Sequence, residues 1–142
     1  MTKQTLTRPD WMYIQSAVIP YRITDDTLEI LLITSRKRTR WVIPKGIIEE
    51  DLEAPASAIK EAWEEAGITG RVAFDEPIGT YTYQKWGGTC HVKVFLFEVR
   101  SVFANWPESS MRDREWVTLS EATDRVQEKE LKKMLNIVPE WL

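Results

Sequence analysis

A run of acidic residues near the middle of the chain constrains its structure more than any other feature. Within Gly46–Ile68, three glutamates, Glu61, Glu64 and Glu65, lie at positions i, i+3 and i+4. On an α-helix this spacing places the three carboxylates on one face. Carboxylates so close repel each other, and a hard divalent cation such as Mg²⁺ or Mn²⁺, which prefers oxygen ligands, would neutralise them. A solvated acidic face is the alternative interpretation.

The helix that carries these glutamates has clear limits in the sequence. Pro55 suits a first helical turn, and Gly67 suits the left-handed residue that ends a helix near Ala66. The opposite face is apolar, and we expect it to pack on a β-sheet. That face consists of Ile59, Ala62, Trp63 and Ala66.

Apolar and β-branched runs on both sides of this helix predict strands. We expect Pro20 near the end of the first strand or at a bulge, and a break of the third strand at residues 44–46. Turn signals lie at residues 24–26 and 85–88. The predicted strands cover residues 11–22, 28–34, 41–43, 70–75, 78–84, 91–100 and 115–117.

Two helices are expected at the end of the chain. Ser120 can cap a helix that continues to about Arg125, and residues 128–135 place apolar side chains at helical spacing. With the glutamate helix, these elements predict an α/β fold, an α/β/α sandwich around a mixed sheet.

Length and composition indicate one globular domain over residues 11–142, preceded by a polar, flexible tail at residues 1–10. The net charge of −3 argues against generic nucleic-acid binding through a basic surface. The single cysteine, Cys90, excludes an internal disulfide and favours a reducing compartment. Since no apolar run approaches a membrane span, we expect a cytoplasmic protein.

Basic residues precede the glutamate helix in a dense segment. Arginine can grip a phosphate with two hydrogen bonds, and lysine adds a compact positive charge. We therefore expect this basic segment to bind the phosphates of a highly charged substrate, with a solvated hairpin tip as the alternative. Arg112 and Arg114 are further candidates, or form surface ion pairs with Asp113 or Glu115. The basic segment consists of Arg36, Lys37, Arg38, Arg40 and Lys45.

The residues from Gly46 onward resemble the Nudix box, G-x5-E-x7-R-E-U-x-E-E-x-G-U, in which U is aliphatic. The matching residues are Gly46, Glu61, Glu64, Glu65, Gly67 and Ile68. Leu52 replaces a glutamate of the pattern, Lys60 replaces its arginine, and Ala62 occupies an aliphatic position. The chain is thus similar to Nudix hydrolases, which implies a Nudix-type α/β/α sandwich with a central mixed β-sheet.

The resemblance also implies the chemistry of the site. Nudix enzymes are metal-dependent phosphoanhydride hydrolases, so Mg²⁺ or Mn²⁺ is the implied cofactor. The implied metal ligands are Glu61, Glu64, Glu65 and the Gly46 carbonyl. Glu64 and Glu65 are the implied catalytic residues, one of them as the possible general base, with Glu108 as a weaker alternative. Lys60 lacks the planar fork of arginine, but it can reach Glu64 one helical turn away and orient it.

The flanking segments ILLITSRKRTRWVIPKG and NWPESSMRDREWVTLSEA extend the resemblance to diphosphoinositol polyphosphate phosphohydrolases. That subgroup cleaves phosphoanhydrides in diphosphoinositol polyphosphates and diadenosine polyphosphates, which are the implied small-molecule substrates. Two alternatives stay open. One is hydrolysis of another nucleoside diphosphate derivative, such as a nucleotide sugar or a damaged nucleoside triphosphate. The other is a non-catalytic sensor that binds a polyphosphate.

Two further points are open at the level of sequence. Trp86, Tyr81 and Tyr83 either stack on a base or pack across strands. Both a monomer and a homodimer are compatible with the pattern.

Overall fold

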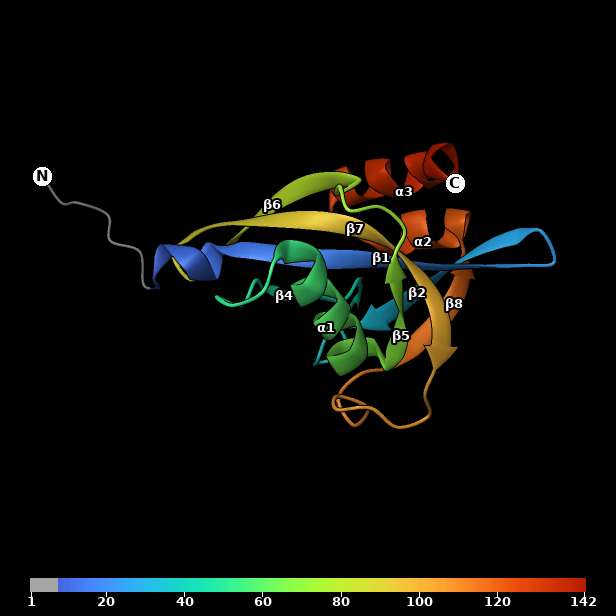
Figure 1. The fold of residues 1–142 in the computed structure, drawn as a ribbon, viewed down its shortest axis with the longest axis horizontal. Coiled ribbons are helices and arrows are strands. Elements are labelled where there is room, and N and C mark those ends of the chain that lie inside the picture. The colour runs from blue at the N-terminus through green and yellow to red at the C-terminus, as the bar shows by residue number, and fades with distance from the viewer. Residues whose placement is uncertain (1–7) are drawn as a thin grey trace, which may run out of the picture.

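The computed structural model describes residues 8–142, so residues 1–7 of the expected tail lie outside the described residues. The helices are η1, a 3₁₀ helix (Asp10–Tyr13), α1 (Ala54–Ala66), α2 (Leu119–Arg125) and α3 (Lys129–Trp141) (Figure 1). The strands are β1 (Ile14–Thr24), β2 (Thr27–Thr34), β3 (Trp41–Val42), β4 (Lys45–Ile47), β5 (Ile68–Val72), β6 (Gly79–Lys85), β7 (Gly88–Val102) and β8 (Arg114–Thr118). None of the helices within residues 8–142 has the length and apolar character needed to span a membrane.

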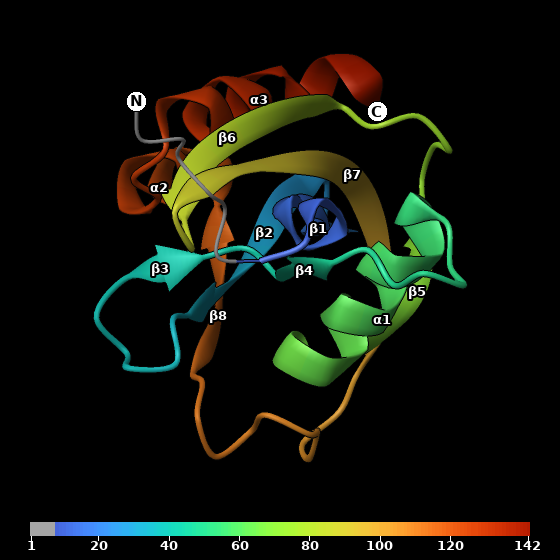
Figure 2. The same ribbon diagram turned by 90° about the vertical axis from the view of Figure 1, so that its left-hand side faces the viewer.

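The strands form one mixed sheet, in which β1 and β7 run parallel and their other neighbours run antiparallel. The order through its centre is β3-β2-β1-β7-β5, while β4 also pairs with β1, β6 with β7 and β8 with β2. Helix α1 lies on one side of the central strands, and α2 and α3 lie on the other side (Figures 1 and 2). The α/β/α sandwich with a central mixed sheet is therefore confirmed.

Two tight hairpins have both of their central residues in the left-handed backbone conformation. Asp25 and Asp26 connect β1 to β2 with φ angles of 50° and 63°, and Trp86 and Gly87 connect β6 to β7 with 54° and 73°. Positive φ at both central residues matches the twist of the flanking strands. Both predicted turns are thus confirmed.

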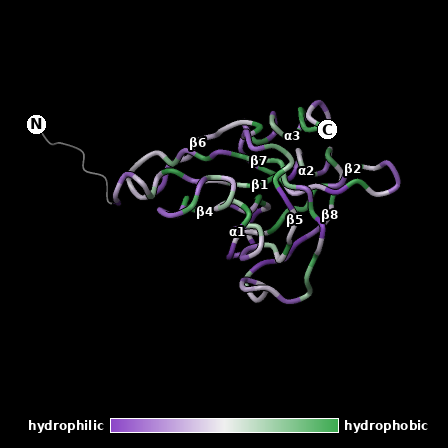
Figure 3. Tube along the Cα trace, in the orientation of Figure 1, coloured by the Kyte–Doolittle hydropathy of each residue, from purple (hydrophilic) through white to green (hydrophobic). Residues whose placement is uncertain are grey.

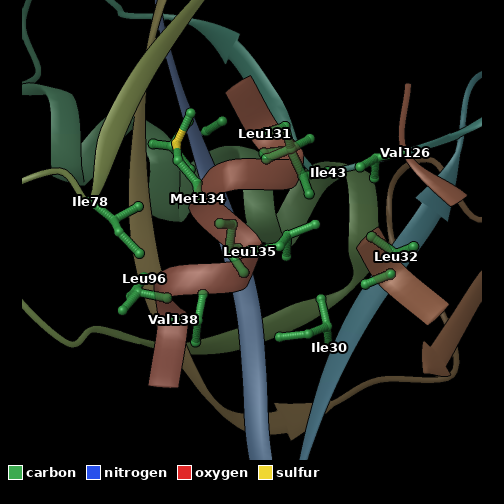
Figure 4. Close-up of a cluster of buried hydrophobic side chains, with 14 of the residues drawn as sticks. Ile30, Leu32, Ile43, Ile78, Leu96, Val126, Leu131, Met134, Leu135 and Val138 are labelled. Atoms are coloured by element: carbon green, nitrogen blue, oxygen red, sulfur yellow. The ribbon is translucent and has the colours of Figure 1, made fainter. Parts of the chain in front are cut away.

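The central strands alternate between two hydrophobic cores, as a sheet covered on both faces requires. From β1, Ala17 and Ile19 enter one cluster and Val18 enters the other. The larger cluster packs the sheet against α3, whose Leu131, Met134, Leu135 and Val138 face Ile30, Leu32 and Leu96 (Figure 4). Figure 3 shows hydrophobic stretches along β1 and β7 through the middle of the molecule.

Helix α1 packs on the second cluster through its smallest side chains. Ala58, Ala62 and Ala66 are fully buried there, because alanine lets the helix approach the sheet closely. Ile59 packs against this cluster as expected, although it is only half-buried, whereas Trp63 is half-buried and lies outside the cluster. Gly67 ends the helix with φ 67°, as predicted.

Several predicted boundaries at the N-terminal half are wrong. The first strand begins at Ile14, because the preceding residues form the 3₁₀ helix. Pro20 lies inside β1 rather than near its end, at the point where β1 changes its antiparallel partner from β4 to β2 and needs no N–H donor. The predicted break after the third strand is confirmed, since β3 ends at Val42 and residues 43–44 belong to no strand. The break is shorter than expected, because Lys45 and Gly46 already pair with β1 as part of β4.

The later boundaries also need correction. The strand expected over residues 70–75 is β5, Ile68–Val72. Thr118, not Ser120, caps α2, because the Thr118 hydroxyl accepts from the backbone N–H of Glu121 while the Glu121 carboxylate accepts from the Thr118 N–H. The final helix continues six residues beyond the predicted end at residue 135, as far as Trp141.

Candidate active site

A polar cavity of about 500 Å³ lies where α1 meets the loop between β2 and β3, the end of β6 and the loop after β7. Acidic and basic side chains share its walls. The acidic ones are Glu61, Glu64, Glu65 and Glu108, and the basic ones are Arg36, Arg40, Lys45, Lys85 and Arg112. The tertiary structure therefore brings the glutamate helix and part of the basic segment to one cavity.

The carboxylate of Glu61 lies against the backbone of Gly46, where it occupies the space that a side chain would need. A Cβ at Gly46 would lie only 2.3 Å from the Glu61 carboxyl carbon, which no side chain can tolerate without displacing Glu61. Burial raises the pKa of Glu61 to about 8, and repulsion from neighbouring carboxylates adds to this shift. The largest of these repulsions come from Glu65 and Glu64. A cation at this place would relieve that repulsion.

Glu65 is the most buried carboxylate of the three and has fixed partners. Its Oε1 accepts a 3.1 Å hydrogen bond from the Lys45 backbone N–H, and its Oε2 lies 3.4 Å from Arg112 Nη2. Burial raises the pKa of Glu65, and Arg112 acts against this rise. Trp106 holds the backbone of the same residue, since its indole N–H donates to the Glu65 carbonyl over 3.0 Å. These contacts fix the orientation of Glu65.

Arg112 is the basic residue whose role sequence reasoning underestimated. It is buried and donates to the Glu108 carboxylate over 2.8 Å and to the Thr34 carbonyl over 3.0 Å, besides pairing with Glu65. The expected alternative of a surface ion pair with a neighbour in sequence is wrong for Arg112. The only signal in the sequence was its place in a segment that resembles a family motif, and this does not reveal burial.

Glu64 is more open than Glu65, since 37% of its side chain is exposed against 10% for Glu65. Lys60 lies one helical turn before it, with Nζ 3.9 Å from Glu64 and 2.6 Å from Glu49. The hydrogen bond to Glu49 is the main reason why the pKa of Lys60 is raised. Glu49 is thus the carboxylate partner of Lys60.

The basic segment divides into two groups. Arg36, Arg40 and Lys45 line the cavity, and Arg36 Nε lies 3.4 Å from Glu108. Burial lowers the pKa of Lys45, whose Nζ lies 5.0 Å from the centre of the Tyr83 ring. The other two members, Lys37 and Arg38, are exposed and do not line the cavity.

Arg38 and Arg114 contact protein groups outside the cavity. Arg38 donates to the Ser110 carbonyl over 2.9 Å and pairs with the Asp113 carboxylate at 3.2 Å. Arg114 donates to the carbonyls of Ala66 and Phe103 and lies over the ring of Trp106. The guanidinium of Arg114 therefore caps the end of α1, and burial lowers its pKa.

The aromatic residues that were candidates for stacking occupy different places. Tyr83 and Trp86 line the cavity, and the Tyr83 hydroxyl donates to the Gln15 side chain over 2.8 Å. Tyr81 is buried and lines a neighbouring pocket instead. Tyr81 and Tyr83 also lie side by side, with ring centres 6.4 Å apart.

The donor set fits a hard divalent cation. Carboxylates and a backbone carbonyl are the ligands that Mg²⁺ and Mn²⁺ prefer, and Glu61, Glu64 and Glu65 occupy one wall of the cavity. Within residues 8–142, no three acidic, histidine or cysteine side chains already form a metal-binding group. Side-chain rotations of the glutamates would therefore accompany metal binding.

Fold and cavity together define an α/β/α sandwich protein whose glutamate-bearing helix faces a cavity lined with arginine and lysine. A family model of the NUDIX domain matches residues 13–140. The chain therefore belongs to the NUDIX domain family.

Known proteins show similarity at two levels. Nudix hydrolase 13, mitochondrial, of Arabidopsis thaliana is 32% identical, and the match covers 77% of this chain and 64% of that protein. This chain thus spans less than two thirds of that curated relative. Diphosphoinositol polyphosphate phosphohydrolase 3-alpha of Mus musculus is 27% identical over 80% of this chain and 69% of its own. The crystal structure of C. elegans Ap4A hydrolase superposes with a TM-score of 0.74 at 23% identity, covering 90% and 96% of the two chains, which supports the fold.

Proposed function

We propose that this protein is a hydrolase, dependent on Mg²⁺ or Mn²⁺, that cleaves phosphoanhydride bonds in dinucleoside polyphosphates or diphosphoinositol polyphosphates. One observation carries the proposal: the glutamates of α1 share a cavity with Arg36, Arg40 and Lys45. The acids suit a metal ion and the bases suit phosphates. The names of the relatives point to the same two substrate classes.

In the proposed reaction, a water oxygen bonds to one phosphorus of the phosphoanhydride, the P–O bond to the bridging oxygen breaks, and the other phosphate group leaves with that oxygen. Negative charge accumulates on the phosphate oxygens during this step. Glu61, Glu64 and Glu65, together with the Gly46 carbonyl, would hold the metal ion. When bound, Mg²⁺ or Mn²⁺ would neutralise part of this charge and make the water more acidic. Glu64 is more accessible to water than Glu65, which is fixed by Arg112, and Glu64 takes the proton of the attacking water.

The basic residues act on the substrate in this proposal. Arg36 and Arg40 are exposed side chains at the rim of the cavity, and Lys45 is a largely buried cation inside it. A buried cation attracts phosphate more strongly than an exposed one, because water screens it less. Lys45 therefore binds the phosphate next to the cleaved bond, and Arg36 and Arg40 bind phosphates of the substrate that lie farther from this bond.

A substrate panel tests the proposal. The protein is incubated with Mg²⁺ or Mn²⁺ and with dinucleoside polyphosphates, inositol pyrophosphates, nucleotide sugars and nucleoside triphosphates, and product release is followed. We expect turnover of one of the first two classes and a fall of about a hundredfold or more in kcat for Glu64→Gln. The exposed Glu53 at the start of α1 makes no side-chain cap, so Glu53→Gln serves as the control.

Other results of this panel separate the alternatives. Tight binding of one polyphosphate without turnover of any compound would replace the hydrolase with a sensor. Faster cleavage of a nucleotide sugar or a damaged triphosphate would reject the proposed substrate class. Unchanged activity of Glu64→Gln would remove this residue from the reaction.

We also propose a cytoplasmic location, which the buried free thiol of Cys90 supports because reducing compartments preserve such thiols. Fluorescence microscopy of the tagged full chain tests this. Accumulation in an organelle would overturn it.

A further inference from the structure

A second cavity of about 240 Å³ opens beside the candidate active site. The two cavities share Arg40, Val42, Lys45 and Tyr83 in their walls. A ligand whose phosphates lie near Lys45 can therefore extend from one cavity into the other without leaving the protein surface. We call the smaller cavity the side pocket.

The side pocket combines apolar surface with one acidic group and the polar Gln127, besides the basic Arg40 and Lys45 that it shares with the larger cavity. Val42, Ile43 and Tyr81 are buried, and with Tyr83 they offer flat apolar and aromatic surface. Burial, and next the nearby Glu128 carboxylate, raise the pKa of Tyr81. Its phenol therefore stays neutral. Flat apolar and aromatic surface beside a small number of polar groups is typical of pockets that hold planar heterocycles.

The acidic group is Glu128, at the start of α3. Its Oε2 is buried and has no hydrogen-bond partner among the described residues. The guanidinium of Arg40 lies 3.8 Å away, which is too long for a hydrogen bond. A buried carboxylate oxygen without a donor is unfavourable, so a ligand that brings an N–H group would satisfy it.

The position of the Arg40 side chain decides whether a ligand can reach Glu128 Oε2. Its side chain is 43% exposed, lines both cavities and has the 3.8 Å contact with Glu128. When a phosphate enters the larger cavity, the same guanidinium can turn to it, since a phosphate is a stronger partner at bonding distance. Glu128 is then free to accept from the ligand.

We propose that the side pocket binds the base of a nucleoside polyphosphate and that Glu128 selects bases with amino N–H donors, guanine above all. An ionised carboxylate only accepts hydrogen bonds. Guanine presents two adjacent N–H groups to it, whereas uracil places carbonyl oxygens beside its single N–H group. A phosphorylated inositol ring would bring negative charge against Glu128. This inference rests on the proposed function and narrows its substrate class to nucleoside polyphosphates.

The kinetic test compares diguanosine tetraphosphate, diuridine tetraphosphate and an inositol pyrophosphate. For the unmodified protein we expect KM to be about tenfold lower for the guanine compound than for the uracil compound. Glu128→Gln and Glu128→Ala should raise KM for the guanine compound by about tenfold, with kcat within roughly twofold. Glu130→Gln, which alters an exposed glutamate on the same helix, should change nothing. Equal KM values in Glu128→Ala and the unmodified protein would overturn the proposal.

A binding test separates this inference from the proposed function. Calorimetry measures the binding of GMP, IMP and UMP to the full chain, and IMP differs from GMP only by the missing amino group. We expect GMP to bind more tightly than IMP, and this preference to disappear in Glu128→Ala. Such a result without any hydrolysis would retain the base pocket and reject the hydrolase. Hydrolysis with equal binding of all three nucleotides would reject the base pocket alone.

Discussion

Arg112, the buried arginine of the site, offers the clearest test of how the buried charges of the site are balanced. Arg112→Met keeps most of the side-chain volume but removes the guanidinium from Glu108, Glu65 and the Thr34 carbonyl, its partners at 2.8, 3.4 and 3.0 Å. The exposed fractions of the Arg112 and Glu65 side chains are 8% and 10%. Loss of one partner from a buried pair costs about 3–5 kcal/mol, because the other charge stays buried.

The sign of the pH dependence follows from the pKa of Glu65, which burial already raises in the folded protein. Without Arg112 this pKa rises further. A raised carboxyl pKa favours the folded state at low pH, and this contribution is lost as pH increases through the folded-state pKa. The destabilisation by Arg112→Met should therefore be larger at pH 8 than at pH 5.

Urea unfolding at both pH values measures this effect. Arg38→Met is the matched control, because Arg38 pairs with Asp113 on the surface with exposed fractions of 45% and 64%. Such a pair contributes about 0–1 kcal/mol. If Arg112→Met and Arg38→Met lowered the free energy of unfolding equally at pH 8, the assigned role of Arg112 would be wrong.

Three further predictions concern the metal ligands and their neighbours. Gly46→Ala should weaken Mg²⁺ binding by about tenfold or more in calorimetry, because the new Cβ displaces the Glu61 carboxylate; unchanged affinity would contradict this. Since the pKa of Glu61 is about 8, Mn²⁺ affinity should rise by roughly tenfold per pH unit from pH 6 to 8 and then level off, and an affinity independent of pH would refute this. The stability of the metal-free protein should fall over the same pH range, because the raised pKa favours the folded state only while Glu61 is protonated. Lys60→Met should lower kcat by on the order of tenfold with little change in melting temperature, because its exposed amine orients Glu64 without supporting the fold; activity equal to that of the unmodified chain would exclude this role.

The glutamate helix shows what local sequence is able to predict. Its limits at Pro55 and Gly67, and the common face of its carboxylates, depend on contacts within one or two turns, which the covalent spacing determines. The two hairpin turns are predictable for a similar reason, because Asp25, Asp26 and Gly87 are residue types that accept positive φ angles. Trp86 is the exception, since tryptophan disfavours its φ of 54° and the turn imposes it.

The errors arose where neighbours distant in sequence decide the outcome. Pro20 stays within a strand because β1 changes partners there. The predicted break after β3 is shorter than expected because Lys45 and Gly46 pair with β1. Trp63 is only half-buried because the sheet approaches α1 along its alanines.

The sequence by itself determined the fold class, the acidic helix and the family resemblance, since each depends on spacing along the chain. Only the tertiary structure decided which charges meet. It buried Arg112 against Glu65, paired Lys60 with Glu49 and placed Glu128 beside the cavity of the glutamate helix. These contacts join residues that different loops and strands bring together, and their burial sets the strength of each charge. The three glutamates of α1 therefore differ in environment only because of the fold. Glu64 is partly exposed, Glu65 is buried against Arg112, and Glu61 is repelled by the neighbouring carboxylates.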